Sequence, residues 1–276
     1  MNVSRVLKRF KAETLSIFPA GGAMGMLFAQ LLQEEGVRHI AVPIAGDTRE
    51  DFSVSESQTG RQYRFILPGP QLSQPEIRAC LETVTKRLRP GGLLVASGSL
   101  PPGVSDDFYA HLAGIATEAS AKFVLDCSGT PLRLAVDRGG LFLIKPSQNE
   151  LAELTGKAVN DREECMDAAR RIVDAKASAF VCVSLGAKGA LLVGRGCAFT
   201  ARAPQVEAQT TVGAGDSLLA ALVWAFVHGA PPGDALKIAV AAGTASLLAP
   251  GTGLSTLVDI ERLKEQVQVE AWEHAS

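Results

Sequence analysis

The sequence predicts an α/β fold with a mostly parallel central sheet and helices on both faces. Short apolar runs alternate with amphipathic helical segments along much of the chain, which is typical of strands buried on both faces. Hydrophobic residues make up 47% of the chain and aromatic residues only 5%, so the core is rich in Ala, Leu and Val. With 276 residues the chain is long enough for one large core, and we predict a single domain over residues 1–276.

The first part of the chain follows a helix–strand rhythm. Apolar residues recur on one helical face from residue 3 to residue 11, and Gly36 has the position of a glycine that ends a helix. Because α/β folds normally open with a strand, this pattern begins in the middle of a unit. We expect a helix over 3–11, a strand over 13–18, a turn over 19–25, a helix over 26–35 and a strand over 39–42.

Residues 48–68 have a different pattern. Two β-prone segments, 51–57 and 62–67, are separated by Gln58-Thr-Gly60, which predicts a β-hairpin laid over another part of the protein. A helix over 71–88 follows, with Pro75 and Glu76 in its first turn.

Four apolar runs then predict the parallel strands of the sheet. Ligands bind beyond the carboxyl ends of such strands, and the residues that follow all four runs are polar or rich in Gly. The expected strands are 92–96, 123–125, 141–144 and 180–185, and they are followed by a small antiparallel extension over 189–193 and 197–203 and by three helices over 214–229, 233–248 and 256–271.

The stretch Gly213-Ala214-Gly215-Asp216 leads into a long apolar helix. The first N–H groups of a helix have no carbonyl partner and the helix dipole is positive there, so this turn favours an anion. A carboxylate in that position can remove a hydroxyl proton while a phosphoryl group arrives. The alternative is an ordinary capped helix, and this stretch alone does not decide between the two.

Other polar residues at the predicted strand ends each have two interpretations. Lys145 can reach a phosphate or can be an ordinary surface lysine. Glu150, with Ser147 three residues before it, can hold Mg²⁺ through water or can be a charge favoured by the helix dipole. Arg49 can clamp a phosphate or face solvent, and Asp126 is a turn former or a second polar group near the site.

Composition and missing motifs exclude several classes of function. The net charge of −2 and the pI of about 6.1 predict neither a nucleic-acid nor a membrane partner. The 5 Cys residues lack metal-ligand spacing and indicate reduced thiols in a cytoplasmic protein, and no apolar run reaches transmembrane length. The sequence also lacks the Walker motif, the protein-kinase signatures and the Rossmann fingerprint.

A series of short motifs runs along essentially the whole chain. They are Asn2-Val-Ser-Arg, Phe18-Pro-Ala-Gly-Gly22, Thr48-Arg49, Tyr63-Arg-Phe65 with Pro68-Gly69, Ser97-Gly-Ser-Leu-Pro-Pro-Gly103, Lys145-Pro-x-x-x-Glu150, Ser184-Leu-Gly186 and Thr211-Val-Gly-Ala-Gly-Asp216. In type and order these motifs resemble those of the ribokinase-like carbohydrate kinases, in particular the phosphofructokinase branch.

This resemblance implies an ATP-dependent enzyme that transfers the γ-phosphoryl group to the C1 hydroxyl of fructose 6-phosphate, giving the glycolytic intermediate fructose 1,6-bisphosphate. A 1-phosphofructokinase or a tagatose-6-phosphate kinase is the alternative. The resemblance implies that Asp216 is the catalytic base and that the amides of Gly213, Ala214 and Gly215 assist it. It implies that Asn2, Arg49 and Ser99 bind the substrate and that Glu150 binds Mg²⁺. The residues that it implies for binding ATP are Lys145, Ser147, Ser184, Gly186, Gly189 and Thr244.

The resemblance also implies further partners. Residues 48–68 form part of a β lid that excludes water on closure and pairs with a second subunit, giving a homodimer. A K⁺ site near residues 210–212 and 246–251 is implied as well.

The chain departs from the family pattern in two places. Ser147 stands where the family has Asn, which predicts weaker use of Mg²⁺. The family's first strand, a sugar-binding Asp and further lid strands have no counterpart before Asn2. Because a missing inner strand leaves backbone groups unpaired, we expect residues 1–276 to be poorly stable and weakly active or inactive. A remnant that binds nucleotide or sugar phosphate without turnover is therefore the second interpretation.

Overall fold

The computed structural model describes residues 1–56, 62–251 and 253–272. Two compact units make up the chain: the first contains residues 1–14, 88–98 and 107–276, and the second contains residues 15–87 and 99–106. The turn predicted at Gln58-Thr-Gly60 lies outside the described residues. The single domain predicted for residues 1–276 stays a prediction.

The first unit is built on a seven-stranded sheet with the strand order β11-β10-β9-β8-β7-β6-β5. The strands that were expected to be parallel, β5 to β8, pair in parallel, whereas β8, β9, β10 and β11 pair antiparallel. This sheet confirms the predicted α/β class. The strands are β5 (Leu93–Ser97), β6 (Lys122–Asp126), β7 (Leu141–Ile144), β8 (Ser178–Ser184), β9 (Ala190–Gly194), β10 (Cys197–Arg202) and β11 (Gln268–Ala271).

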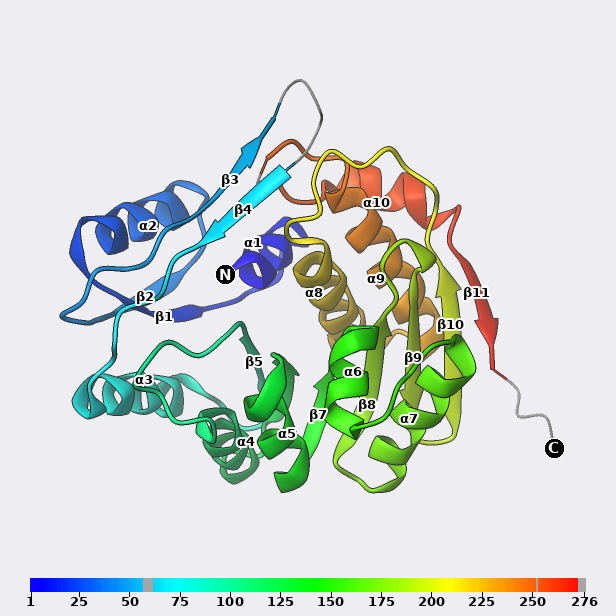
Figure 1. Ribbon diagram of the computed structural model, residues 1–276, viewed down its shortest axis with the longest axis horizontal. Coiled ribbons are helices and arrows are strands. Elements are labelled where there is room, and N and C mark those ends of the chain that lie inside the picture. Colours follow the sequence, from blue (N-terminus) through cyan, green and yellow to red (C-terminus); the bar gives the residue numbers. More distant parts are fainter. Residues whose placement is uncertain (57–61, 252, 273–276) are drawn as a thin grey trace. The chain divides into compact units, whose positions relative to one another are not determined.

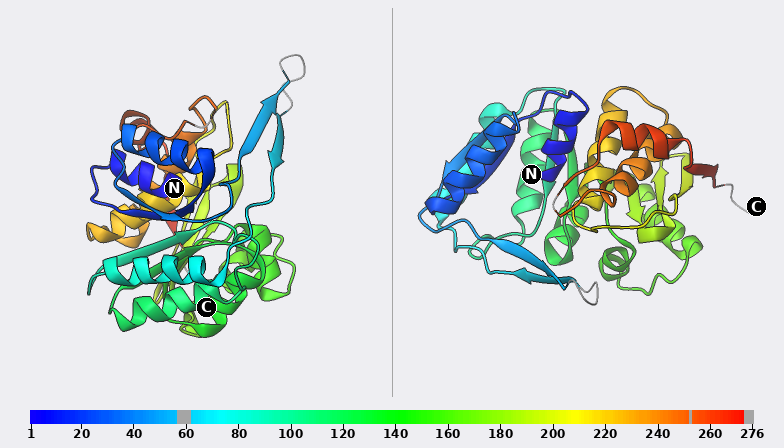
Figure 2. Two further views of the ribbon diagram at one scale, coloured as in Figure 1. Left: turned by 90° about the vertical axis from the view of Figure 1, so that its left-hand side faces the viewer. Right: turned by 90° about the horizontal axis from the view of Figure 1, so that it is seen from above.

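Helices cover both faces of this sheet, as Figures 1 and 2 show. One face carries α1 (Asn2–Arg9), α8 (Ala214–Val227), α9 (Pro232–Ser246) and α10 (Leu257–Lys264), and α8 and α9 pack closely on each other. The other face carries α4 (Phe108–Glu118), α5 (Gly129–Arg138), α6 (Gln148–Thr155) and α7 (Arg162–Asp174).

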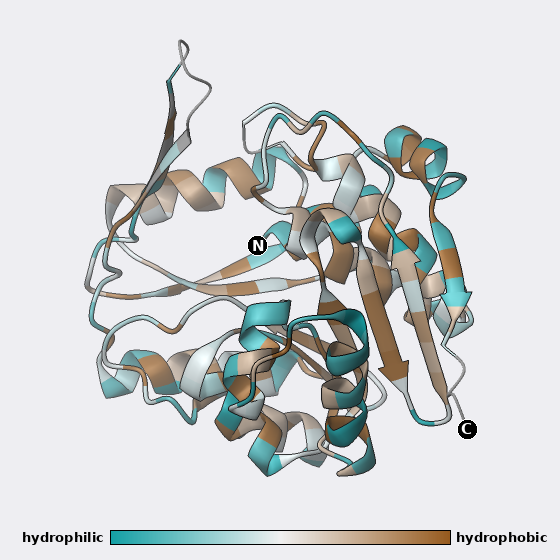
Figure 3. Ribbon diagram, turned by 45° about the vertical axis from the view of Figure 1, so that its right-hand side comes forward, coloured by the Kyte–Doolittle hydropathy of each residue, from teal (hydrophilic) through white to brown (hydrophobic). Residues whose placement is uncertain are grey.

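The core of the first unit joins α8 and α9 to the sheet. Val124, Leu143 and Leu192 from three different strands pack in one cluster with Leu219 and Leu222 of α8, and all five are fully buried. Figure 3 shows the strands of this sheet largely in brown, whereas much of the teal lies on the covering helices. Such burial on both faces explains why these strands have continuous apolar sequences. No helix of the described residues is long and apolar enough to cross a membrane.

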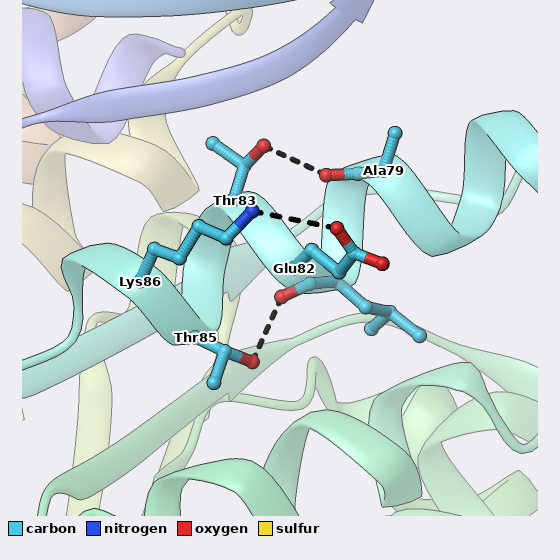
Figure 4. A network of polar contacts seen from close by, with 6 residues as sticks. Ala79, Glu82, Thr83, Thr85 and Lys86 are labelled. Carbon is cyan, nitrogen blue, oxygen red and sulfur yellow. Dashed lines mark hydrogen bonds and ion pairs between the residues drawn. The ribbon is translucent and has the colours of Figure 1, made fainter.

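The second unit contains two small sheets. In one, β1 (Ser16–Ala20) pairs in parallel with β2 (His39–Pro43), next to α2 (Gly22–Glu34) and α3 (Gln74–Arg87). In the other, β3 (Asp51–Ser55) and β4 (Gln62–Ile66) form the predicted antiparallel hairpin. The exposed side of α3 carries a local network in which Lys86 pairs with Glu82 and two Thr hydroxyls bond to carbonyls one turn earlier (Figure 4).

Several predicted boundaries differ from the structure, and three of the differences have a clear cause. The last helix ends at Lys264 and not near residue 271, because residues 268–271 pair with β10 as strand β11. Helix α2 begins at Gly22, within the segment predicted as a turn, since Gly21 and Gly22 start the helix directly after β1. Strand β1 also extends beyond its predicted end at residue 18. Its pairing with β2 continues through Pro19 to Ala20, which lies opposite Pro43.

Candidate active site

The N-terminus of α8 presents uncapped backbone amides. Gly213 stands at the N-cap with a left-handed backbone (φ 80°), and no side chain caps the helix. The first intrahelical bond runs from the N–H of Ser217 to the carbonyl of Gly213, which leaves the amides of residues 214–216 without an intrahelical acceptor. The positive φ and a Leu254 methyl group 2.7 Å from where a Cβ would lie both require glycine at residue 213. This helix end is therefore suited to an anion.

Asp216 lies in the first turn of α8 and both of its oxygens have contacts. Oδ2 accepts a hydrogen bond from the side-chain amide of Asn2 at 2.9 Å, and Oδ1 lies 3.5 Å from the hydroxyl of Ser97. Asn2 comes from α1, which packs beside α8 (Figure 1), and Ser97 is the last residue of β5. The carboxylate is partly exposed, so a substrate hydroxyl can reach it.

Lys145 is buried, which rules out the interpretation as a surface lysine. Its Nζ forms an ion pair of 3.1 Å with Oδ1 of Asp126, and the two side chains are 7% and 17% exposed. Burial alone would lower the pKa of Lys145, but the Asp126 carboxylate reverses this and the pKa is raised. Burial raises the pKa of Asp126, and Lys145 opposes that rise. The lysine is therefore held in its charged form at neutral pH.

The ammonium group of Lys145 lies over the start of α8. A Cβ added at Gly215 would lie 3.3 Å from Nζ, which is a tight contact, so the ammonium group lies close against the backbone of residue 215. A fixed positive charge therefore stands beside the uncapped amides and near Asp216. This arrangement can neutralise the charge of a phosphoryl group at the helix end.

Glu150 and Ser147 form a reciprocal cap at the start of α6. The Ser147 amide donates to Oε2 of Glu150 at 2.7 Å, and the Glu150 amide donates to the Ser147 hydroxyl at 3.3 Å. Among the described residues nothing donates to Oε1 of Glu150, which leaves that oxygen able to accept from a water. Glu150 also influences the pKa of Asp126 through space, so the two carboxylates lie in one neighbourhood.

This donor set fits a magnesium ion that keeps its waters. Among the described residues, no three His, Cys, Asp or Glu side chains form a cage for a metal. Mg²⁺ is commonly held by one or two carboxylates, by waters and by the phosphates of the substrate. Asp126 ends β6, and Glu150 stands in the first turn of α6, which follows the neighbouring strand β7, so two carboxylates of that kind are present and the fit is adequate.

The turn after β8 lies beside the turn after β7. Ser184 forms a β-bridge with Ser147, and its amide donates to the carbonyl of Pro146 at 3.0 Å. A Cβ at Gly186 would enter open space, whereas one at Gly189 would lie 2.0 Å from the carbonyl oxygen of Ala201. Gly189 is thus required by packing against β10, while Gly186 leaves an open surface that a ligand can approach.

Thr244 is placed differently from the other predicted nucleotide residues. It is 4% exposed within α9, and its hydroxyl donates to the carbonyl of Val240 one turn earlier at 2.9 Å. Its polar group is therefore already satisfied inside the helix. Contact with an adenine ring at this position stays a prediction.

Arg49 and Ser99 belong to the second unit. The guanidinium of Arg49 lies 3.7 Å from a carboxylate oxygen of Asp51 and is partly exposed. A Cβ at Gly69 would touch both the stem of Arg49 and Pro101, so Gly69 brings Arg49 close to the loop that begins with Ser99. The two predicted substrate residues therefore come from neighbouring segments of one unit.

Within the first unit, the structure brings Asn2, Lys145 and Asp216 to one end of α8, and it brings Ser147, Glu150 and Ser184 to the adjoining strand ends. Sequence reasoning gave no role to Ser97 and left Asp126 open between two interpretations. Their common signal is position, since each is the last residue of a parallel strand and the two are paired in register.

Comparison with known proteins places the chain in a defined family of carbohydrate kinases. The model of the pfkB family of carbohydrate kinases matches residues 1–259, and the chain belongs to this family. It is a sugar kinase of the phosphofructokinase type, which confirms the resemblance and the ribokinase-like fold.

Several relatives show how closely it matches. The chain is 38% identical over 265 residues to the ATP-dependent 6-phosphofructokinase isozyme 2 of Mycobacterium tuberculosis, covering 96% of this chain and 78% of that protein. It is 31% identical over 271 residues to the 1-phosphofructokinase of Borreliella burgdorferi, covering 98% and 86%. The crystal structure of Escherichia coli phosphofructokinase-2 with potassium superposes with a TM-score of 0.92 at 34% identity, covering 96% and 85%. The same Escherichia coli protein with fructose-6-phosphate gives a TM-score of 0.90 at 33% identity.

Proposed function

We propose that this protein transfers the γ-phosphoryl group of ATP to the C1 hydroxyl of fructose 6-phosphate. The observation that carries the proposal is Asp216, held by Asn2 in the first turn of an uncapped helix and beside the buried ammonium of Lys145. The likeness to 6-phosphofructokinases supports the substrate, while the likeness to 1-phosphofructokinases keeps fructose 1-phosphate as the alternative. Tagatose 6-phosphate is the third candidate.

The chemistry assigned to the residues is a single displacement at phosphorus. Asp216 takes the proton of the C1 hydroxyl, the C1 oxygen forms a bond to the γ-phosphorus, and the bond from that phosphorus to the bridging oxygen of ADP breaks. The amides of residues 213–215 and the Lys145 ammonium stabilise the negative charge on the transferring group. Arg49 and Ser99 hold the sugar phosphate, and Ser184 and Gly186 line the nucleotide.

Glu150, with Asp126, would hold Mg²⁺ through water, and the ion supplies charge neutralisation on the ATP phosphates when it is bound. Ser147 is a shorter donor than Asn, which supports weaker Mg²⁺ use. A K⁺ site near residues 210–212 and 246–251 is part of the proposal, supported by the potassium complex of the Escherichia coli relative.

A coupled assay of ADP release tests the proposal. Fructose 6-phosphate, fructose 1-phosphate, tagatose 6-phosphate and ribose are compared at saturating ATP and Mg²⁺. We expect Asp216→Asn to lower kcat by about 10²–10⁴-fold on the preferred sugar, because general base catalysis contributes that much. Asp234→Asn is the matched control, since this exposed Asp stands in the first turn of α9. Full turnover by Asp216→Asn would contradict the proposal.

The hairpin β3–β4 supports the proposed homodimer. Phe52 and Phe65 stack at 4.9 Å, yet they are 48% and 47% exposed. Val54, Tyr63 and Ile66 on the same hairpin are also exposed. A two-stranded hairpin is marginal by itself, and its apolar residues are stabilised if the hairpin of a second copy covers them. We propose that this hairpin is part of the lid and the subunit interface.

A non-catalytic sugar-phosphate or nucleotide binder is the second candidate. In the described part of the chain, β5 is an edge strand of the seven-stranded sheet, and every residue of β5 is at least partly exposed. The predicted low stability is what would accompany such a binder. Calorimetric binding of ATP without turnover, unchanged in Asp216→Asn, would favour this candidate. A cooperative melt with normal turnover would exclude it.

A further inference from the structure

Helix α1 carries both Asn2, whose side chain bonds to Asp216, and Arg5, whose side chain bonds to Asn2. Asn2 and Arg5 are three residues apart and therefore lie on the same face of the helix. Arg5 Nη1 donates to the side-chain oxygen of Asn2 at 3.2 Å, while the side-chain nitrogen of Asn2 donates to Oδ2 of Asp216 at 2.9 Å. The three side chains thus form a chain of hydrogen bonds that ends at the proposed base.

The polarity of this chain fixes the orientation of the Asn2 amide. A guanidinium can only donate hydrogen bonds and a carboxylate can only accept them. The Asn2 oxygen must therefore face Arg5 and its NH₂ group must face Asp216. If the amide turned over, its NH₂ group would meet the guanidinium and its oxygen would meet the carboxylate, and both contacts would be repulsive. Without Arg5, only the contact with Asp216 would select the orientation.

The same geometry distinguishes the two oxygens of Asp216. Oδ2 is occupied by the bond from Asn2, whereas the contact between Oδ1 and the Ser97 hydroxyl is long, at 3.5 Å. A hydroxyl also rotates freely about its C–O bond. Oδ1 is thus the oxygen on which a substrate proton can be received.

We propose that Arg5 is a positioning residue that acts through Asn2, and that Oδ1 of Asp216 is the atom that accepts the proton from the sugar. This inference rests on the proposed function. It gives Asn2 a role toward the base in addition to the contact with the sugar that the sequence predicted. Arg5 itself touches neither ATP nor the sugar in this proposal.

A double-mutant cycle on kcat tests whether Arg5 acts through Asn2. We expect Arg5→Met to lower kcat about tenfold with little change in the KM for ATP, and Arg5→Lys to recover part of the loss because Lys can still donate. In an Asn2→Ala background, Arg5→Met should change kcat less than twofold, since the link is already absent. Lys8→Met on the exposed side of α1 is the matched control and should leave kcat unchanged.

The cycle separates the two proposals. Suppose that Asp216→Asn abolishes turnover. If Arg5→Met then leaves kcat intact, or if the loss of kcat in the double variant equals the product of the losses in Arg5→Met and Asn2→Ala, the positioning role is wrong and the proposed function stands. If Asp216→Asn keeps full turnover, the proposed function itself fails.

A readout independent of turnover comes from the ¹⁵N resonances of the Asn2 side-chain amide. They should shift in both Asp216→Asn and Arg5→Met but not in Lys8→Met. Resonances that stay in place in Arg5→Met, with a melting temperature equal to that of the parent protein, would overturn the inference.

Discussion

Removing the charge of Lys145 should destabilise the protein even though the residue is proposed to serve catalysis. Lys145→Met keeps the length of the aliphatic stem, so the loss is mainly the ammonium group. It leaves the Asp126 carboxylate, only 17% exposed, without the partner that now lies 3.1 Å away. Breaking a buried ion pair by removing one partner costs about 3–5 kcal/mol. Because burial already raises the pKa of Asp126, this group can relieve part of the cost by taking up a proton, so we expect about 3 kcal/mol.

Thermal unfolding without ligands measures this cost. For a chain of this size each kcal/mol lowers Tm by about 2–4 °C, so Lys145→Met should melt about 6–12 °C below the parent protein. Adding Asp126→Asn should recover part of the loss, because no buried charge then remains. Lys157→Met, at an exposed lysine after α6, is the control and should leave Tm unchanged. A Tm of Lys145→Met within 2 °C of the parent, or a double variant no more stable than the single one, would refute the reasoning.

The pH dependence follows from the direction of the shift. The folded state raises the pKa of Lys145 above 10.5, so the stabilisation from this group is complete below that pH and is lost as the pH rises through the folded value. The difference in Tm between the parent and Lys145→Met should therefore narrow above about pH 10.5. It should also narrow at acidic pH, because Asp126, whose pKa is raised by burial, then takes up a proton in both proteins and the ion pair is lost. A difference in Tm that does not narrow at either end of the pH range would contradict the assignment.

Three other predictions concern the interface, the metal and one turn. Phe52→Asp should convert the proposed homodimer to a monomer in light scattering, because it would place a charge on the apolar face of the hairpin. Val258→Asp is the control, since the Val258 side chain on α10 is 78% exposed, and it should leave the dimer intact. An intact dimer in Phe52→Asp would reject the interface. Ser147→Asn should lower the Mg²⁺ concentration needed for half-maximal rate without loss of stability, since Asn is an equally good N-cap; an unchanged activation curve would reject the weaker Mg²⁺ use. Gly189→Ala should lower the free energy of unfolding in denaturant by at least about 2 kcal/mol, because of its φ of 100° and the clash of the new Cβ with Ala201. Gly186→Ala should lower it by about 1 kcal/mol, because its Cβ would enter open space. Equal losses of stability would show that the clash is relieved.

Much of the fold follows from local patterns in the sequence. The four parallel strands were predictable because continuous apolar runs between amphipathic helices are the consequence of burial on both faces of a sheet. The start of α8 was predictable because a glycine turn before a Leu- and Ala-rich segment leaves the amides at that helix end exposed. Asp216 and Lys145 could be selected for the same reason, since each stands at the end of an element where ligands bind.

Other features needed the pairing of distant segments. Residues 268–271 have helix-compatible residues, but β10 offers an unpaired edge, and its hydrogen bonds make them a strand. Local propensity is a weak signal compared with such a partner. Thr244, for which contact with the nucleotide stays a prediction, is buried within α9, which packs closely on α8.

The sequence by itself determined which chemical groups are present and at which ends of the elements they stand. Only the tertiary structure decided their partners: Asn2 reaches Asp216 across 214 residues of chain, and Lys145 meets Asp126 because β6 and β7 are neighbours in the sheet. The physical reason is that a hydrogen bond or an ion pair depends on distances of about 3 Å, and these distances are set by the packing of α1 on α8 and by the strand order, not by spacing along the chain.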